Sequence, residues 1–172
     1  MTFFLLGAVL GFFVSSSFAN DGDELLRYVD RHGEKFDSLA LVLWDYAELG
    51  YLESLSSTKL QQVLADDGFE IQAGVAGIPT AFVASFGEGK PVIGILAEFD
   101  ALPGISQAAV SSRQLLEGKE SGRACGNHLF GTGSTAAAMA VRNWMENNNV
   151  KGTVRLYGTP AEEGGSGKVY LV

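Results

Sequence analysis

Two short apolar runs, each followed closely by acidic residues, constrain the fold of this chain more than any other feature. Residues 91–97 are almost wholly apolar, and residues 154–157 form a second run of similar character. Such strands are typical of central positions in a sheet that is covered on both faces. Asp100 follows the first run and Glu162 follows the second. Because functional groups of such sheets lie at the carboxyl ends of the strands, we expect both acids at one edge.

The remaining segments predict an α/β fold, a mixed sheet with helices on both faces. Helical spacing of apolar residues indicates the helices, and turn residues separate the strands. Helix, hairpin, central strand, helix and central strand follow one another along the chain. The predicted helices are 23–50, 59–67 (capped by Ser57 and Thr58) and 131–147, the predicted strands are 69–73, 80–86, 91–97 and 153–157, and 100–121 is predicted as loop.

Size and charge limit the class of protein. The chain has 172 residues, enough for one domain with a sizeable core, and 47% of them are hydrophobic. The formal net charge of −8 disfavours nucleic acid and anionic membrane surfaces as partners. A single cysteine excludes a disulfide within the chain. We therefore expect a globular protein that does not bind nucleic acid.

The first nineteen residues have the pattern of a signal peptide. An unbroken apolar run, residues 3–14, is followed by Ser17-Phe18-Ala19, which offers small residues at both key positions of a cleavage site. The run is shorter than the about 20 residues that span a bilayer. No basic residue precedes it, which departs from the usual pattern, and a buried or interfacial helix is the alternative. We expect export to the periplasm or medium, cleavage after Ala19, and no stable membrane span afterwards.

The second apolar run leads into an acidic pair, Glu162 and Glu163, followed by Gly164 and Gly165. Carboxylates at the end of a buried strand are costly unless they are paired or bind a metal. One carboxylate of such a pair can ligate a metal while the other handles a proton. The alternative is an exposed acidic turn.

Two further motifs carry candidate ligands. Cys125 and His128 lie just before a predicted helix, and thiolate and imidazole suit zinc and similar ions. The alternative is a small buried cysteine beside a surface histidine. Glu98 and Asp100 alternate onto one side of a strand end, where Asp100 could orient a ligand residue. The alternative there is a pair of solvated loop acids.

Taken together, four motifs in this order resemble the co-catalytic metallopeptidases that include aminoacylases and carboxypeptidase G, in particular their amidohydrolase branch. The resemblance extends from about residue 23 to residue 172. Its strongest carriers are WDYAELGYLE (44–53), GILAEFDALP (94–103), ACGNHLFG (124–131) and TPAEEGGSGK (159–168).

The resemblance implies a catalytic α/β domain that holds two divalent metal ions, zinc or manganese. It makes Glu162 the general base, Glu163 a metal ligand, Cys125 a bridging or adjacent ligand, and Asp100 the acid that orients a ligand. The implied reaction is hydrolysis of an amide in a small N-acyl amino acid or short peptide. The family also has a smaller dimerisation domain, so full-length relatives are expected to be homodimers. Residues 20–172 would then be the N-terminal part of the catalytic domain, without the dimerisation domain or C-terminal part.

The sequence departs from the family pattern at the metal site. The amidohydrolase branch has histidine two residues after the cysteine, where Asn127 stands here, and His128 follows it. Either His128 ligates after a backbone shift or Asn127 coordinates through its oxygen. Arg123 also replaces a histidine that is common in the family. The family's remaining metal ligands would lie beyond residue 172.

These departures leave two other functions open. An inactive fragment or pseudoenzyme would act at most as a binding module. A thiol hydrolase that uses Cys125 and His128 is the third possibility, although residues three apart seldom achieve the required geometry without a scaffold built for it.

Overall fold

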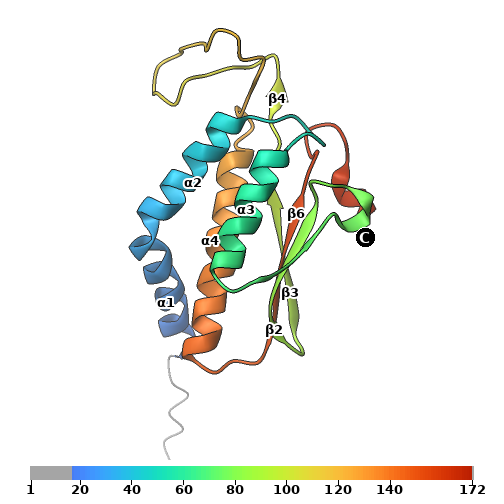
Figure 1. Ribbon diagram of the computed structural model, residues 1–172. Helices are drawn as coiled ribbons and strands as arrows, with labels where there is room; N and C mark the ends of the chain where they lie inside the picture. The colour runs from blue at the N-terminus through green and yellow to red at the C-terminus, as the bar shows by residue number, and fades with distance from the viewer. Residues whose placement is uncertain (1–16, 172) are drawn as a thin grey trace, which may run out of the picture.

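The computed structural model describes residues 17–171 as a sheet with α-helices packed on one side of it (Figure 1). Its elements in chain order are α1 (Ser17–Arg31), α2 (Gly33–Tyr46), α3 (Ser54–Asp66), β1 (Glu70–Ala73), η1 (Val75–Gly77), β2 (Phe82–Glu88), β3 (Val92–Glu98), β4 (Leu102–Pro103), β5 (Ser121–Gly122), α4 (Asn127–Asn147), β6 (Gly152–Thr159) and η2 (Gly167–Tyr170). This confirms the predicted α/β class.

The main sheet is mixed, with the strand order β1-β2-β6-β3. β1 and β2, and β2 and β6, are antiparallel, whereas β3 and β6 are parallel. A parallel pair requires a crossover, which α4 provides. The register pairs Ala97 with Gly158 and Glu98 with Thr159. Both strands therefore end at one edge, as the sequence predicts, and the segments that carry Asp100 and Glu162 start there.

The four α-helices lie on one side of this sheet, where α3 and α4 cover its face. α4 packs against β3 and β6, and α1, α2 and α3 pack against α4 (Figure 1). The sequence predicts helices on both faces, but α1 to α4 all lie on one side (Figure 1), and Lys168 of η2 lines a hollow beside Leu96 and Tyr157. The side chains buried between the sheet and the helices include Leu43, Leu60, Leu64, Phe82, Phe99, Met139 and Leu156.

The predicted central position of β3 is wrong for the described residues. β3 pairs with β6 alone and lies at the edge of the sheet. Val92, Ile93 and Leu96 are 47%, 56% and 46% exposed. An apolar run indicates that a strand is suited to burial, but it does not say which segment covers the strand.

The predicted helix over 23–50 is two helices. His32 has ψ 14° and separates α1 from α2, and α2 ends at Tyr46 because Ala47 is left-handed with φ 42°. The apolar spacing continues across this break, which is why the sequence pattern did not indicate it.

Two other helices begin earlier than predicted. α3 starts at Ser54, so Ser57 lies inside the helix and its hydroxyl donates to the carbonyl of Thr80 instead of capping. α4 starts at Asn127 rather than Gly131, directly after left-handed Gly126 (φ 94°). The predicted loop 100–121 contains one short strand, β4, which pairs in antiparallel fashion with β5 at the end of the loop.

The predicted signal peptide lies largely outside the described residues. Its apolar run precedes residue 17, and only the Ser17–Ala19 backbone is described, as the start of α1. In the part of the chain that is described, no helix has both the length and the apolarity needed to cross a membrane.

Candidate metal and proton-transfer site

The candidate site lies where β3 and β6 end. Three segments meet there: the residues after β3, the first turn of α4, and residues 160–167 after β6, which we call the acidic loop. The parallel register of β3 and β6 brings the first and third segments together. The crossover then returns α4 to the same edge.

Asp100 joins these three segments. Its side chain is buried, with only 1% of the residue exposed. One carboxylate oxygen accepts from the Asn127 side-chain amide at 3.1 Å, and the other accepts from the backbone N–H of Glu163 at 2.9 Å. Buried carboxylates need such donors. With both oxygens engaged, Asp100 can orient α4 and the acidic loop.

Cys125 and Glu163 lie together beside Asp100. The Cys125 thiol is 3.9 Å from the carbonyl oxygen of Asp100. Partial burial raises the pKa of the Cys125 thiol, and the nearby Glu163 carboxylate raises it further. The backbone N–H of Asn127 and the charge of Arg123 act in the opposite direction. The thiol and the carboxylate therefore form one pair of potential ligands.

Asn127 and His128 face different neighbours because adjacent helical residues point in different directions. Asn127 faces Asp100. The His128 ring packs edge-on against Trp44 of α2, with ring centroids 4.8 Å apart. Its Nδ1 atom is buried and has no hydrogen-bond partner within residues 17–171. Burial, and the charge of Arg123, lower the pKa of His128.

Glu162 is exposed and lies on the solvent side of the acidic loop. Its carboxylate is 4.0 Å from the Lys168 ammonium, which also pairs with Glu98 at 2.7 Å. The structure therefore places Glu162 beside Glu163 but in a different environment. An exposed carboxylate can meet a water molecule and a substrate.

Arg123 supports the site in a way that its sequence position did not indicate. It is 1% exposed and donates to the carbonyls of Phe99, Asp100 and Leu43, and to the hydroxyl of Ser56. Burial lowers the pKa of Arg123. This side chain ties the end of β3 to α2 and α3.

Glu53 is a second residue that sequence reasoning did not single out. It is fully buried, and its carboxylate accepts from the backbone N–H of Ala161 at 2.8 Å. Glu53 lies within the first of the four motifs, but nothing in the local pattern distinguishes it from Glu48 five residues earlier.

The donor set determines which metal the site could hold. Within residues 17–171, no three His, Cys, Asp or Glu side chains are grouped so that they could hold a metal ion. Asp100 is a pure acceptor, so it must face the amide nitrogen of Asn127, which leaves the amide oxygen free. That oxygen, the Cys125 sulfur and the Glu163 carboxylate are suitable donors for one divalent ion. These three donors suit such an ion, but they make up only part of the ligands that it would need.

The chain is similar to hydrolases of amide bonds. It is 42% identical over 154 residues to one component of the p-aminobenzoyl-glutamate hydrolase of Escherichia coli, an alignment that covers 87% of this chain and 32% of that protein. It is 27% identical to hippurate hydrolase of Campylobacter jejuni, over 84% of this chain and 36% of that protein. The chain thus spans about a third of the length of these curated relatives. No protein-family model matches it.

Solved structures share the fold. An aminohydrolase structure from methicillin-resistant Staphylococcus aureus matches with a TM-score of 0.70 at 22% identity, over 87% of this chain and 38% of that one. A dinuclear metal-binding peptidase of the M20 family from Bacillus subtilis matches with a TM-score of 0.56 at 25% identity, over 83% of this chain and 37% of that one. The predicted resemblance is confirmed: this chain is a homologue of amidohydrolases and has the α/β fold of M20 peptidase domains.

Proposed function

We propose that this chain supplies metal ligands and the proton-transfer base of a metal-dependent amidohydrolase. The single observation that carries the proposal is the position of Asp100, which joins Asn127 on α4 to Glu163 in the acidic loop. Two strand ends and a helix start thereby bring Cys125, Asn127 and Glu163 around Asp100, with Glu162 next to Glu163 in the chain.

Each residue has a distinct task in this proposal. Cys125, Glu163 and the Asn127 oxygen hold a divalent ion, and Asp100 fixes the direction of the Asn127 amide. A bound ion supplies Lewis acidity to the scissile carbonyl and to water. Glu162 takes a proton from the attacking water and donates it to the leaving amine nitrogen. His128 has a packing role against Trp44.

The substrate class follows from the relatives. The names of the two hydrolases specify p-aminobenzoyl-glutamate and hippurate, each an aromatic acyl group joined to an amino acid by an amide. We propose a small N-acyl amino acid or short peptide as substrate. The dinuclear M20 neighbour supports two metal ions. We propose zinc or manganese, with further ligands outside residues 17–171, and a homodimer for the full-length enzyme.

The test compares Glu162→Gln with Glu163→Gln in the protein that contains this chain. Hydrolysis of p-aminobenzoyl-glutamate and hippurate is followed with zinc or manganese added, and bound metal is measured by mass spectrometry. Glu162→Gln should keep its metal and lose about 10²–10⁴ in rate, the usual range for general acid–base catalysis. Glu163→Gln should lose metal. Hydrolysis by Glu162→Gln at the parental rate would show that the assigned roles are wrong.

A binding module without catalysis is the second candidate function. The observation in its favour is that an amide at position 127 faces Asp100 while the histidine next to it is directed elsewhere. Such a module would bind the same N-acyl amino acids in a calorimeter without hydrolysing them, and it would hold no stoichiometric metal. Hydrolysis by the parental protein would exclude it.

Export is part of the proposal because the apolar run and Ser17-Phe18-Ala19 have the pattern of a cleaved leader. N-terminal sequencing of protein from the exported fraction should find Asn20 as the first residue. An intact Met1 on a cytoplasmic product would contradict this.

A further inference from the structure

Two buried carboxylates hold backbone N–H groups on either side of Glu162. Asp100 accepts from the N–H of Glu163 at 2.9 Å, and Glu53 accepts from the N–H of Ala161 at 2.8 Å. We propose that Glu53 is a positioning residue, which holds the acidic loop so that the Glu162 carboxylate is placed for proton transfer. The proposal rests on the function proposed above.

The acidic loop needs an external restraint at Ala161. This residue is buried and has a left-handed backbone with φ 55°, a conformation that side chains other than glycine disfavour. Its carbonyl oxygen accepts from the N–H of Gly165 at 3.0 Å, which closes the loop on itself. Its N–H has Glu53 as partner. Loss of that partner would leave a buried N–H without a hydrogen bond and a strained residue without support.

The segment that carries Glu53 also fits closely against Ala161. A Cβ atom placed on Gly50 would lie 2.9 Å from the Ala161 Cα atom, so the turn before Glu53 fits the loop only without a side chain at this position. The segment that carries Glu53 is therefore already in contact with the loop. The position of the Glu53 carboxylate is restricted because the whole residue is buried.

A role confined to helix α3 does not account for the Glu53 side chain. Glu53 occupies the N-cap position of α3, but its side chain makes no capping hydrogen bond and crosses to the acidic loop instead. Glu48 supports that helix start, since its carboxylate accepts from the N–H groups of Leu55 and Ser56 at 2.9 and 2.8 Å. Glu48 therefore holds the start of α3, and Glu53 holds the acidic loop.

A buried carboxylate is also a costly choice for a merely structural acceptor. Burial raises the pKa of Glu53, although the N–H of Ala161 favours the ionised form. An ionised acceptor makes a stronger hydrogen bond than a neutral one. This strength suits a restraint on a strained loop.

The test uses Glu53→Ala, Glu53→Gln and the matched control Glu48→Ala in the protein that contains this chain. Hydrogen–deuterium exchange of the peptide that covers residues 159–167 reports the loop, because exchange measures local opening. Hydrolysis of p-aminobenzoyl-glutamate gives kcat and KM, and mass spectrometry gives metal content. Should Glu53→Ala lose protection throughout the chain, Glu53→Asp replaces it, with the carboxylate retained at a shorter reach.

Glu53→Ala should raise loop exchange about tenfold or more, and it should lower kcat about tenfold or more with KM and metal content nearly unchanged, as expected for a displaced catalytic group. Glu53→Gln retains an acceptor oxygen but not its charge, so both measurements should lie between those of the parent and those of Glu53→Ala. Glu48→Ala should raise exchange only at the start of α3.

Parental loop exchange in Glu53→Ala would overturn the proposal, whatever the activity. Increased loop exchange with parental kcat would also overturn it, because Glu53 would then hold the loop without placing the base. A parental protein that hydrolyses no amide overturns the function proposed above and the catalytic half of this inference together, while the exchange data still decide whether Glu53 holds the loop.

Discussion

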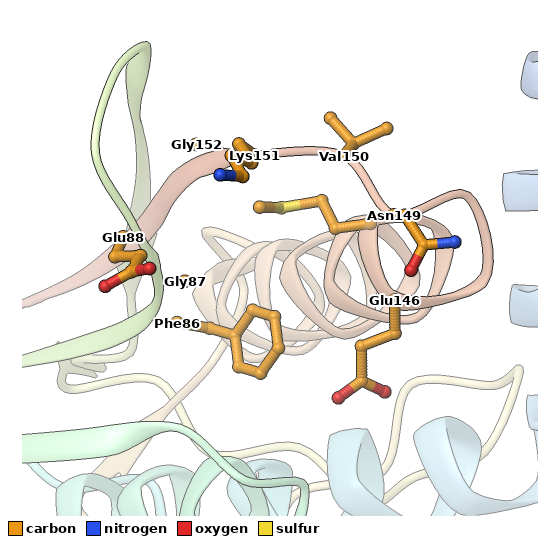
Figure 2. Close-up of a pocket in the computed structure, with 9 residues that line it drawn as sticks. Phe86, Gly87, Glu88, Glu146, Asn149, Val150, Lys151 and Gly152 are labelled. Atoms are coloured by element: carbon orange, nitrogen blue, oxygen red, sulfur yellow. The ribbon is translucent and has the colours of Figure 1, made fainter.

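The hollows at the two ends of the sheet differ in volume and in the chemistry of their linings. At the carboxyl end of β3 and β6, a hollow of 260 Å³ is lined by Asp100, Glu163, Gly164 and Gly165. At the opposite end, between β2 and the end of α4, a larger hollow of 450 Å³ is lined by Glu88, Glu146 and Lys151 around the Phe86 ring (Figure 2). The smaller hollow is the one we assign to function.

Burial is the physical basis of that choice. Glu53, Asp100 and Arg123 are each 1% exposed or less, and hydrogen bonds fix their positions. Glu88, Glu146 and Lys151 are exposed, and the pairing of Glu146 with Arg142 is a surface contact within one helix. Charges in water interact weakly, whereas buried ones must be paired or positioned. Cavity volume alone would have selected the other end.

Arg123→Met should give the largest change in stability at the carboxyl end. The substitution removes donors from the buried carbonyls of Phe99, Asp100 and Leu43. We expect a loss of about 3 kcal/mol or more in the free energy of unfolding, since each unsatisfied buried group costs about 1–3 kcal/mol. Denaturant unfolding measures it. Arg155→Met, at an exposed position of β6, is the control and should change little. Equal losses in both variants would remove the distinction between buried and exposed charge.

The next effect concerns metal affinity. Asp100→Asn replaces one acceptor oxygen by a donor, so it cannot accept from both Asn127 and Glu163. We expect zinc affinity to fall about 10–100-fold, the usual cost of losing a residue that orients a ligand. Competition with a chromogenic chelator measures it.

Three companion variants locate the ligands. Cys125→Ser should lower zinc affinity because a thiolate is lost, and Asn127→His should raise it if position 127 faces the ion. His128→Ala should leave affinity near the parental value, since His128 packs against Trp44. A large loss in His128→Ala would move the ligand from position 127 to position 128.

The sequence predicted those parts of this site that depend on local pattern. Residues 92–98 and 152–159 are strands because their runs are apolar, and the acids at their ends meet because parallel strands end at one edge. This argument alone predicted Asp100 and Glu162 at that edge.

The supporting residues could not be predicted in the same way. Glu53 and Arg123 are charged, and only tertiary packing shows that both are buried. The start of α4 depends on the left-handed conformation of Gly126, which the sequence permits but does not require. That start decides that Asn127, and not His128, faces Asp100. The edge position of β3 depends on which segments pair with it.

The pH dependence of stability offers a smaller effect. Burial raises the folded-state pKa of Glu53 above its ordinary value of 4.5, so in the pH range between the two values the folded state binds more protons than the unfolded chain. Glu53 therefore favours folding fully below pH 4.5, and this contribution is lost as pH rises through the folded-state pKa. Glu53→Gln has no such loss.

The stability of Glu53→Gln relative to the parent should therefore increase as pH rises from 4.5, by at most about 1.4 kcal/mol per pH unit. Urea unfolding of both proteins across this range measures the difference, in which all other titrating groups cancel. A difference that is constant with pH would mean that Glu53 titrates normally and that its burial is not maintained in solution.

The smallest effect is expected at the larger hollow. Lys151→Met and Glu88→Gln each remove one exposed charge that makes no ion pair within residues 17–171. Surface substitutions of this kind change the free energy of unfolding by about 0.5 kcal/mol or less. Neither residue touches the acidic loop, so zinc affinity and amide hydrolysis should both equal those of the parent. Chelator competition, urea unfolding and kcat with p-aminobenzoyl-glutamate measure the three quantities. If Lys151→Met lowered kcat as strongly as Glu162→Gln, the chemistry would lie at the amino end of β6, and the comparison between the two ends would be reversed.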